Sequence, residues 1–158
     1  MYYTINIKSK DLKIKIKLKN IMLFNNLDDE TIELIESFTY QGSIDKDGIL
    51  FYEGDNSKYL YLLTTGIVKL YKISSKNKKI ILKYFHSNEL IGEVANFEQI
   101  PYPATAQAFT KIEFLKIDFD ELKKVIYSNA ELSFKIQTSL IKKIKNLERI
   151  ISLDLVLD

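Results

Sequence analysis

Residues 91–106, IGEVANFEQIPYPATA, form the segment whose residue types could hold a ligand. Gly92 can adopt a positive φ or allow a close backbone approach, and Glu93 can accept hydrogen bonds from a ligand hydroxyl or from loop amides. Two prolines stiffen the return to a strand that begins near Ala104. Such a loop suits an anion, yet no Arg or Lys lies between Glu93 and Ala108. A cation for that anion would have to come from elsewhere.

The composition narrows the class of protein and excludes several chemistries. The chain has 158 residues, enough for one domain, and a net charge of +2 that points to no particular acidic partner. It has no cysteine, which excludes disulfides and cysteine-ligated iron–sulfur clusters. His86 is the single histidine, so a histidine-based catalytic metal site is excluded and we expect no enzyme. No apolar run approaches the ~20 residues that span a bilayer, so we expect a cytoplasmic protein without membrane contact.

The N-terminal stretch at residues 13–19, KIKIKLK, alternates strictly. A period of two predicts a strand with one wholly basic face. That face could bind nucleic acid or a membrane, but a solvated edge strand whose lysines discourage aggregation is the interpretation we favour. We therefore treat residues 1–19 as a basic extension ahead of the folded domain.

The central residues, 20–129, have the pattern of a β-barrel preceded by a helix. Asp28 or Asp29 can cap that helix. Its buried stripe is expected to be Ile32, Leu34, Ile35 and Phe38. From residue 40 to residue 119, short apolar runs alternate with glycine-containing turns, which predicts an antiparallel barrel or jelly roll. The expected fold class is mainly β with flanking helices, and a short helix capped near Asp118 ends this part.

A long helix is predicted over residues 130–154. Apolar residues with spacings of four, three and four form the seam of a two-stranded coiled coil: Leu140, Ile144, Leu147 and Ile151. A second apolar face can pack on the chain's own barrel: Phe134, Ile136, Ile141 and Ile150. The seam would then be free to pair with a second copy, so we expect a homodimer.

Taken in order, the runs DGILFYEGD, YLLTTGIVKLYK, ILKYFHSNELIGEV and ATAQAFTKIEFLKI resemble the cyclic-nucleotide-binding-like sensor domain of the Crp/Fnr transcription regulators. The resemblance covers about residues 20–158. It implies a double-stranded β-helix jelly roll, dimerisation through the long helix, and a hinge near Leu153-Asp154 that leads to a DNA-binding domain. DNA would be bound only through that domain, which lies outside this chain. We expect the chain to be a sensor domain cut from such a regulator.

The resemblance also matches the opening segment to the family's phosphate-binding cassette. Gly92 and Glu93 match its Gly-Glu pair, and Glu93 would accept the ribose hydroxyl. Tyr102 and Pro103 stand where the family has Arg and Ser, and the loop is one residue shorter. Losing the charged partner of a buried phosphate commonly costs about 3–5 kcal/mol, or roughly two to four decades of affinity. Cyclic AMP is therefore not the expected effector.

The candidate ligand residues are those of this degenerate cassette: Gly92, Glu93, Val94, Ala95, Tyr102 and Pro103. The resemblance adds four residues to the pocket lining: Leu70, Leu82, Leu147 and Glu148. Simpler interpretations stay open, since both barrel leucines serve equally as core. Glu93 either binds a ligand hydroxyl or satisfies loop amides, and Tyr102 either reaches a ligand or, as we favour, covers the vacated space.

The effector is left open by the sequence. We expect an unknown small molecule to change the pitch of the paired long helices. One alternative is haem, through which some members of the family sense nitric oxide or carbon monoxide, with His86 as axial ligand. A lone histidine in a turn is more often solvent-facing. The other alternative is a ligand-free dimerisation module with a side-chain-filled barrel.

Overall fold

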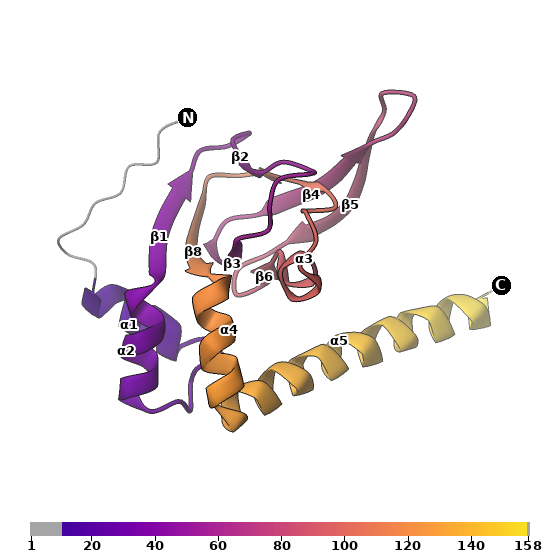
Figure 1. Cartoon of the computed structure of the whole chain (residues 1–158). Helices are drawn as coiled ribbons and strands as arrows, with labels where there is room; N and C mark the ends of the chain where they lie inside the picture. Colours follow the sequence, from indigo (N-terminus) through magenta and orange to yellow (C-terminus); the bar gives the residue numbers. More distant parts are fainter. Residues whose placement is uncertain (1–10, 158) are drawn as a thin grey trace.

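The structure is a computed structural model that describes residues 11–157 (Figure 1). The strands of this part are β1 (Thr39–Ile44), β2 (Ile49–Phe51), β3 (Tyr59–Thr65), β4 (Val68–Ile73), β5 (Lys79–Phe85), β6 (Leu90–Ile91), β7 (Thr105–Ala108) and β8 (Ile112–Asp118). Its helices are α1 (Asp11–Lys19), α2 (Asp29–Ser37), α3 (Glu93–Glu98), α4 (Phe119–Ser128) and α5 (Ala130–Leu157). None of these helices is long and apolar enough to cross a membrane.

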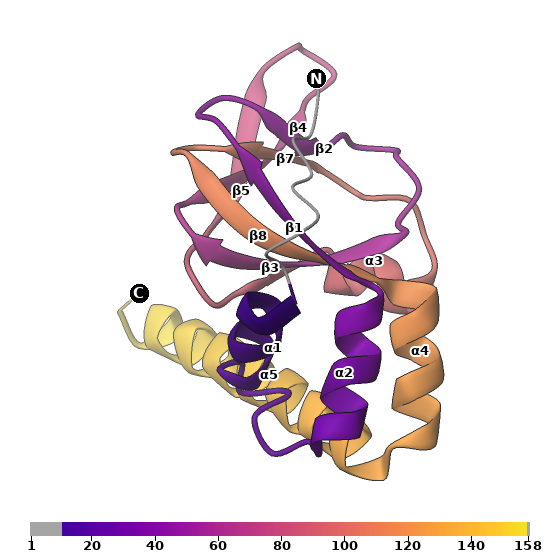
Figure 2. The same ribbon diagram turned by 90° about the vertical axis from the view of Figure 1, so that its left-hand side faces the viewer.

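The strands form two antiparallel four-stranded sheets, in the orders β1-β8-β3-β6 and β2-β7-β4-β5. Figure 2 shows the two sheets facing each other as a roll, with the helices gathered at one end. The predicted mainly β fold with flanking helices, a jelly roll followed by a long helix, is confirmed.

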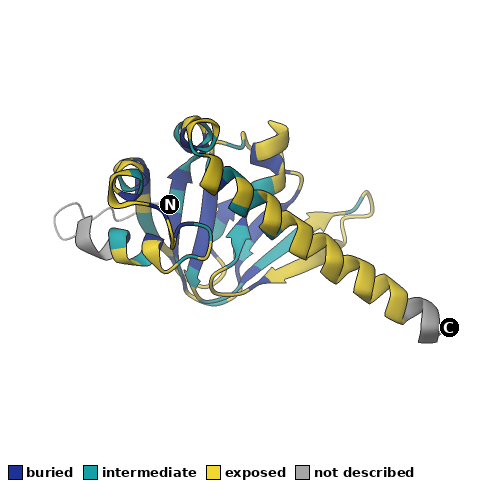
Figure 3. Cartoon of the chain, turned by 90° about the horizontal axis from the view of Figure 1, so that it is seen from below, coloured by how far each residue is buried: buried dark blue, intermediate teal, exposed yellow. Residues whose placement is uncertain are grey.

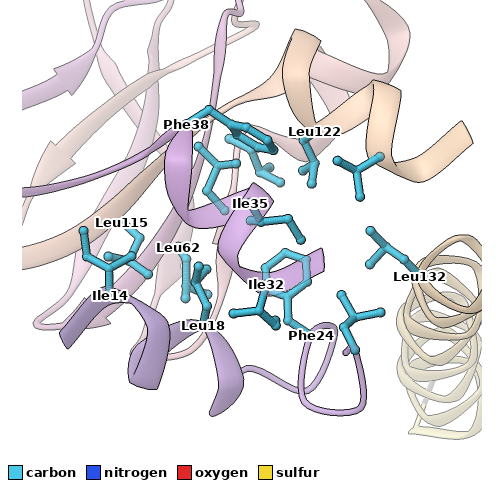
Figure 4. Close-up of a cluster of buried hydrophobic side chains, with 14 of the residues drawn as sticks. Ile14, Leu18, Phe24, Ile32, Ile35, Phe38, Leu62, Leu115, Leu122 and Leu132 are labelled. Atoms are coloured by element: carbon cyan, nitrogen blue, oxygen red, sulfur yellow. The ribbon is translucent and has the colours of Figure 1, made fainter. Parts of the chain in front are cut away.

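Two apolar cores follow from the alternation of side chains along the strands. In β3, Tyr61 and Leu63 point into the roll between the sheets, whereas Leu60 and Leu62 point outward. The outward side chains form a second cluster with the helices, shown in Figure 4. Strand β3 is therefore buried on both faces.

The prediction of a basic strand at residues 13–19 is wrong, because these residues lie in α1. Ile14 and Leu18, four residues apart, are buried in the helix-side cluster, whereas Ile16 between them is 52% exposed. Lys15 and Lys19 form ion pairs with α2, so the basic face is partly neutralised. Alternation of period two permitted this outcome, since positions i and i+4 share a face in a helix as well as in a strand. Residues 1–10 lie outside the described part.

The two capped helices begin where the sequence predicts. Asp28 caps α2 by accepting a hydrogen bond from the Thr31 amide, and Asp118 caps α4 by accepting one from the Glu121 amide. The expected buried stripe of α2 is correct except at Leu34, which is 52% exposed.

The predicted long helix is confirmed as α5, but its expected second face is wrong. Only Ile136 packs partly against the helix-side cluster, and the other members, Phe134, Ile141 and Ile150, are exposed. Leu132 is the buried anchor near the start of the helix. Figure 3 shows α5 leaving the body of the molecule as an exposed rod. The covered side of α5 is therefore short, and its second half projects with exposed side chains.

Candidate functional site

The cassette begins with a turn that glycine permits. Gly92 has a φ of +87° and directly precedes α3. A Cβ at this position would lie 3.0 Å from Cε1 of Tyr102. Buried Asn96 fixes the turn, because its side-chain amide donates to the carbonyl oxygens of Gly92 (2.7 Å) and Tyr59 (2.8 Å). The backbone of the cassette is thus held by its own side chains.

Tyr102 occupies the interior of the roll. Its side chain is 3% exposed, and its ring stacks on that of Phe51, with centroids 3.7 Å apart and planes 13° from parallel. The phenol donates a hydrogen bond of 2.6 Å to the Tyr59 carbonyl oxygen. Burial raises the pKa of Tyr102, so the group stays neutral at physiological pH. A neutral aromatic side chain therefore stands at the sequence position that the resemblance assigns to an arginine.

The backbone around Tyr102 is also closed. Its amide donates to the Asp55 carbonyl oxygen (2.9 Å), and its carbonyl oxygen accepts from the Gly54 amide (2.8 Å). Pro103, next along the chain, is exposed. The cassette is thereby attached to the β2–β3 loop through groups that a ligand could otherwise use.

Glu93 is paired with a cation from the far end of the chain. Its carboxylate lies 2.7 Å from Nζ of Lys143 on α5, and its side chain is 16% exposed. Val94 is exposed and Ala95 is buried in the roll core. The cation missing from the segment is thus supplied by α5, where it neutralises Glu93 itself.

The lysines of the nearby sheet already have partners. Lys83 lies 3.4 Å from Glu89 and over the ring of Phe85, and Lys72 lies 3.7 Å from Glu53. Each of these pairs reduces the positive charge available to a phosphate.

The remaining pocket candidates are dispersed. Leu70 packs against the roll core, whereas Leu82 is 51% exposed on β5. Leu147 and Glu148 lie exposed on α5. The structure does not bring these four side chains together, so their role in a pocket stays a prediction.

His86 lies exposed in the turn between β5 and β6, where its backbone amide donates to the Glu89 carboxylate. A haem slot requires apolar enclosure around the axial ligand. The residues around His86 do not fit such a slot. In the described part of the chain, no group of three or more His, Asp or Glu side chains could hold a metal ion.

A small groove, partly open to solvent, lies outside the roll between β3, β6, the α1–α2 loop, α3, α4 and α5, and has a volume of about 30 Å³. Its lining is apolar apart from Glu93, Ser139 and Lys143. Glu93 therefore faces this groove. Sequence reasoning missed Lys143 and Asn96; the available signal for Lys143 was its helical spacing of seven from Ile136, which puts both on the covered side of α5.

The seam predicted for a dimer is exposed along α5. The exposed fractions are 42% for Leu140, 54% for Ile144, 60% for Leu147 and 57% for Ile151. These residues share one face of the helix, as their spacing requires. Leu140 also lines the groove, and beyond it the single chain leaves that face without cover.

Comparison with known proteins gives the family. A profile described as "Cyclic nucleotide-binding domain" matches residues 42–129, more than half of the chain. The "Anaerobic regulatory protein" of Bacillus subtilis is 30% identical over 104 residues, which are 65% of this chain and 44% of that protein. The chain therefore spans less than half the length of this relative.

Two solved structures are similar in fold. The N-terminal domain of a transcriptional regulator from Streptomyces coelicolor superposes with a TM-score of 0.66 and 26% identity, over 85% of this chain and 94% of the other. The sensor domain of the transcriptional regulator DNR from Pseudomonas aeruginosa superposes with a TM-score of 0.76 and 21% identity. The match covers 89% of this chain and 93% of the other. The chain belongs to the cyclic nucleotide-binding domain family, and its relatives include regulators of the Crp/Fnr type.

Proposed function

We propose that the chain is the effector-sensing domain of a Crp/Fnr-type transcription regulator and that it does not respond to cyclic AMP. The similarity to regulatory proteins and to their sensor domains supports the first part. Binding of DNA is proposed only for a domain outside this chain.

The observation that carries the second part is the buried ring of Tyr102. A cyclic phosphate in the cassette would need that volume and a cation, and it would find a stacked aromatic ring bonded to the Tyr59 carbonyl oxygen. Glu93, which the resemblance assigns to the ribose, is instead paired with Lys143. Both recognition groups of the cassette are therefore committed to the protein itself.

The proposed output is a change in α5. An effector that favours one position of this helix over another shifts the population between the two positions. In a homodimer joined through the exposed seam, such a shift would move whatever follows residue 158. A differential affinity worth a few kcal/mol is sufficient.

Calorimetric titration with cyclic AMP and then cyclic GMP tests the proposal. We expect no heat of binding up to millimolar nucleotide. The double variant Tyr102→Arg/Pro103→Ser restores the family's pair and should bring measurable binding, provided that circular dichroism shows it folded. The matched control, Tyr40→Arg/Ser43→Ala, changes exposed residues of β1, at the opposite edge of the sheet from β6, and should bring none. Micromolar binding by the unaltered chain would overturn the proposal.

The two alternatives make different predictions. A haem sensor would show a Soret band after haem addition, and His86→Ala would remove it. A ligand-free dimerisation module would bind no small molecule and would still form a dimer.

A further inference from the structure

Two opposite charges border the exposed seam of α5. Ile144 and Ile151 occupy position a of a heptad, and Leu147 occupies position d. Lys143 then takes position g and Glu148 position e, on opposite borders of the seam. They are not neighbours on their own helix, where contacts join residues three or four apart. Each charge is therefore available to a second helix packed on the seam.

The order of these charges fits two helices that run in the same direction. In a parallel pair, position g of one helix lies beside position e of the next heptad on the other, and Glu148 lies five residues beyond Lys143, as this contact requires. Two-fold symmetry forms the contact twice. In an antiparallel pair, g lies beside g, which sets Lys143 against Ile150 or a second Lys143. The charges are therefore complementary in the parallel arrangement.

Both side chains are accessible to a partner. Lys143 donates one hydrogen bond of 2.7 Å to Oε1 of Glu93, and its side chain is 46% exposed. An ammonium group has three donors, so two remain for further acceptors. Glu148 is exposed and forms no ion pair within residues 11–157 of the single chain. A carboxylate from a second copy therefore has a route to Lys143 from the solvent side.

We propose that in the homodimer the partner's Glu148 joins Glu93 at the ammonium group of Lys143, once on each side of the dimer. The cassette of each copy then shares its cation with a carboxylate of the other copy. Glu93 and the partner's Glu148 compete for Lys143, because two negative charges close to one ammonium repel each other. A change at Glu93 is thereby transmitted to the dimer, and by linkage the dimer acts back on Glu93. This inference rests on the homodimer of the proposed function and is independent of the identity of the effector.

Charge reversal tests the contact through the choice of partner. Lys143→Glu and Glu148→Lys each place like charges in both contacts of a homodimer, whereas their mixture restores two opposite-charge contacts in the heterodimer. Loss of the Glu93 pair in the first variant is the same in both kinds of dimer and cancels. With one chain isotope-labelled, native mass spectrometry of the equimolar mixture should show the heterodimer enriched about tenfold or more over random pairing.

The matched control mixes Glu148→Lys with Lys142→Glu, which reverses a charge at position f, on the side of α5 away from the seam. Its heterodimer has one favourable and one unfavourable contact, the mean of the two homodimers, so random pairing is expected. Random pairing in the test mixture as well would exclude the contact. An unaltered chain that stays monomeric at high concentration would exclude it together with the seam.

The coupling to the cassette is measured separately. Glu93→Gln removes one of the two competing charges and should lower the dissociation constant of the dimer about threefold in analytical ultracentrifugation. In a Glu148→Gln background the same change should have no effect, because no competitor remains. Glu89→Gln is the matched control, since Glu89 forms its ion pair with Lys83. A constant that Glu93→Gln leaves unchanged, or changes equally in both backgrounds, would contradict the competition.

A cyclic AMP titration keeps the two proposals apart. Micromolar binding of the nucleotide sinks the proposed lack of a cyclic AMP response and leaves the choice of partner untouched. Random pairing in a dimer that binds no nucleotide sinks the contact at Lys143 and leaves the proposed function standing.

Discussion

At the scale of single residues, the buried ring of Tyr102 is expected to affect both stability and ligand specificity. Its ring is buried against Phe51 and its hydroxyl is bonded to the Tyr59 carbonyl oxygen. Tyr102→Ala should lower the free energy of unfolding by about 3–5 kcal/mol, because a buried aromatic side chain leaves a cavity. Urea denaturation measures the change. Tyr52→Ala, at a tyrosine that is 58% exposed, should change it by less than about 0.5 kcal/mol, and equal effects would mean that Tyr102 does not fill the roll.

The sequence predicts that Tyr102 covers the vacated space but not how it is fixed. Its partner, the Tyr59 carbonyl oxygen, lies 43 residues away, and Glu93 and Lys143 lie 50 residues apart. Local patterns carry no information about such pairs. They depend on how the roll closes and where α5 crosses it, which only the assembled fold determines.

At the scale of elements, α1 shows why a periodic pattern can mislead. The helix is selected because Ile14 and Leu18 enter the cluster beside α2, whereas a strand would bring Ile16 to the same face. Leu18→Ala should therefore destabilise the protein by about 2–5 kcal/mol in thermal or urea unfolding. Ile16→Ala should change stability by less than about 0.5 kcal/mol. Equal losses at both positions would favour the strand.

The longer elements were predictable because several signals agree in each of them. Both caps, the β-runs and the period of α5 point to the same fold at the local and global levels. The prediction that a second face of α5 packs on the barrel was wrong, because amphipathicity alone does not determine which apolar side of a helix contacts the rest of its own chain. In the structure, Leu132 and Ile136 pack into the helix-side cluster and so determine which side of α5 is covered, whereas Phe134 is exposed to solvent.

At the scale of the whole molecule, the exposed seam of α5 predicts a dimer. Ile144 is 54% exposed in the middle of a stripe with coiled-coil spacing. We expect the chain to elute as a dimer in size exclusion with light scattering. Ile144→Asp should shift it to monomer, because a charge buried between two helices is strongly unfavourable. Asn146→Asp adds the same charge to α5 off the seam and should leave the dimer intact. A monomeric unaltered chain at high concentration, or equal loss of dimer in both variants, would contradict the seam.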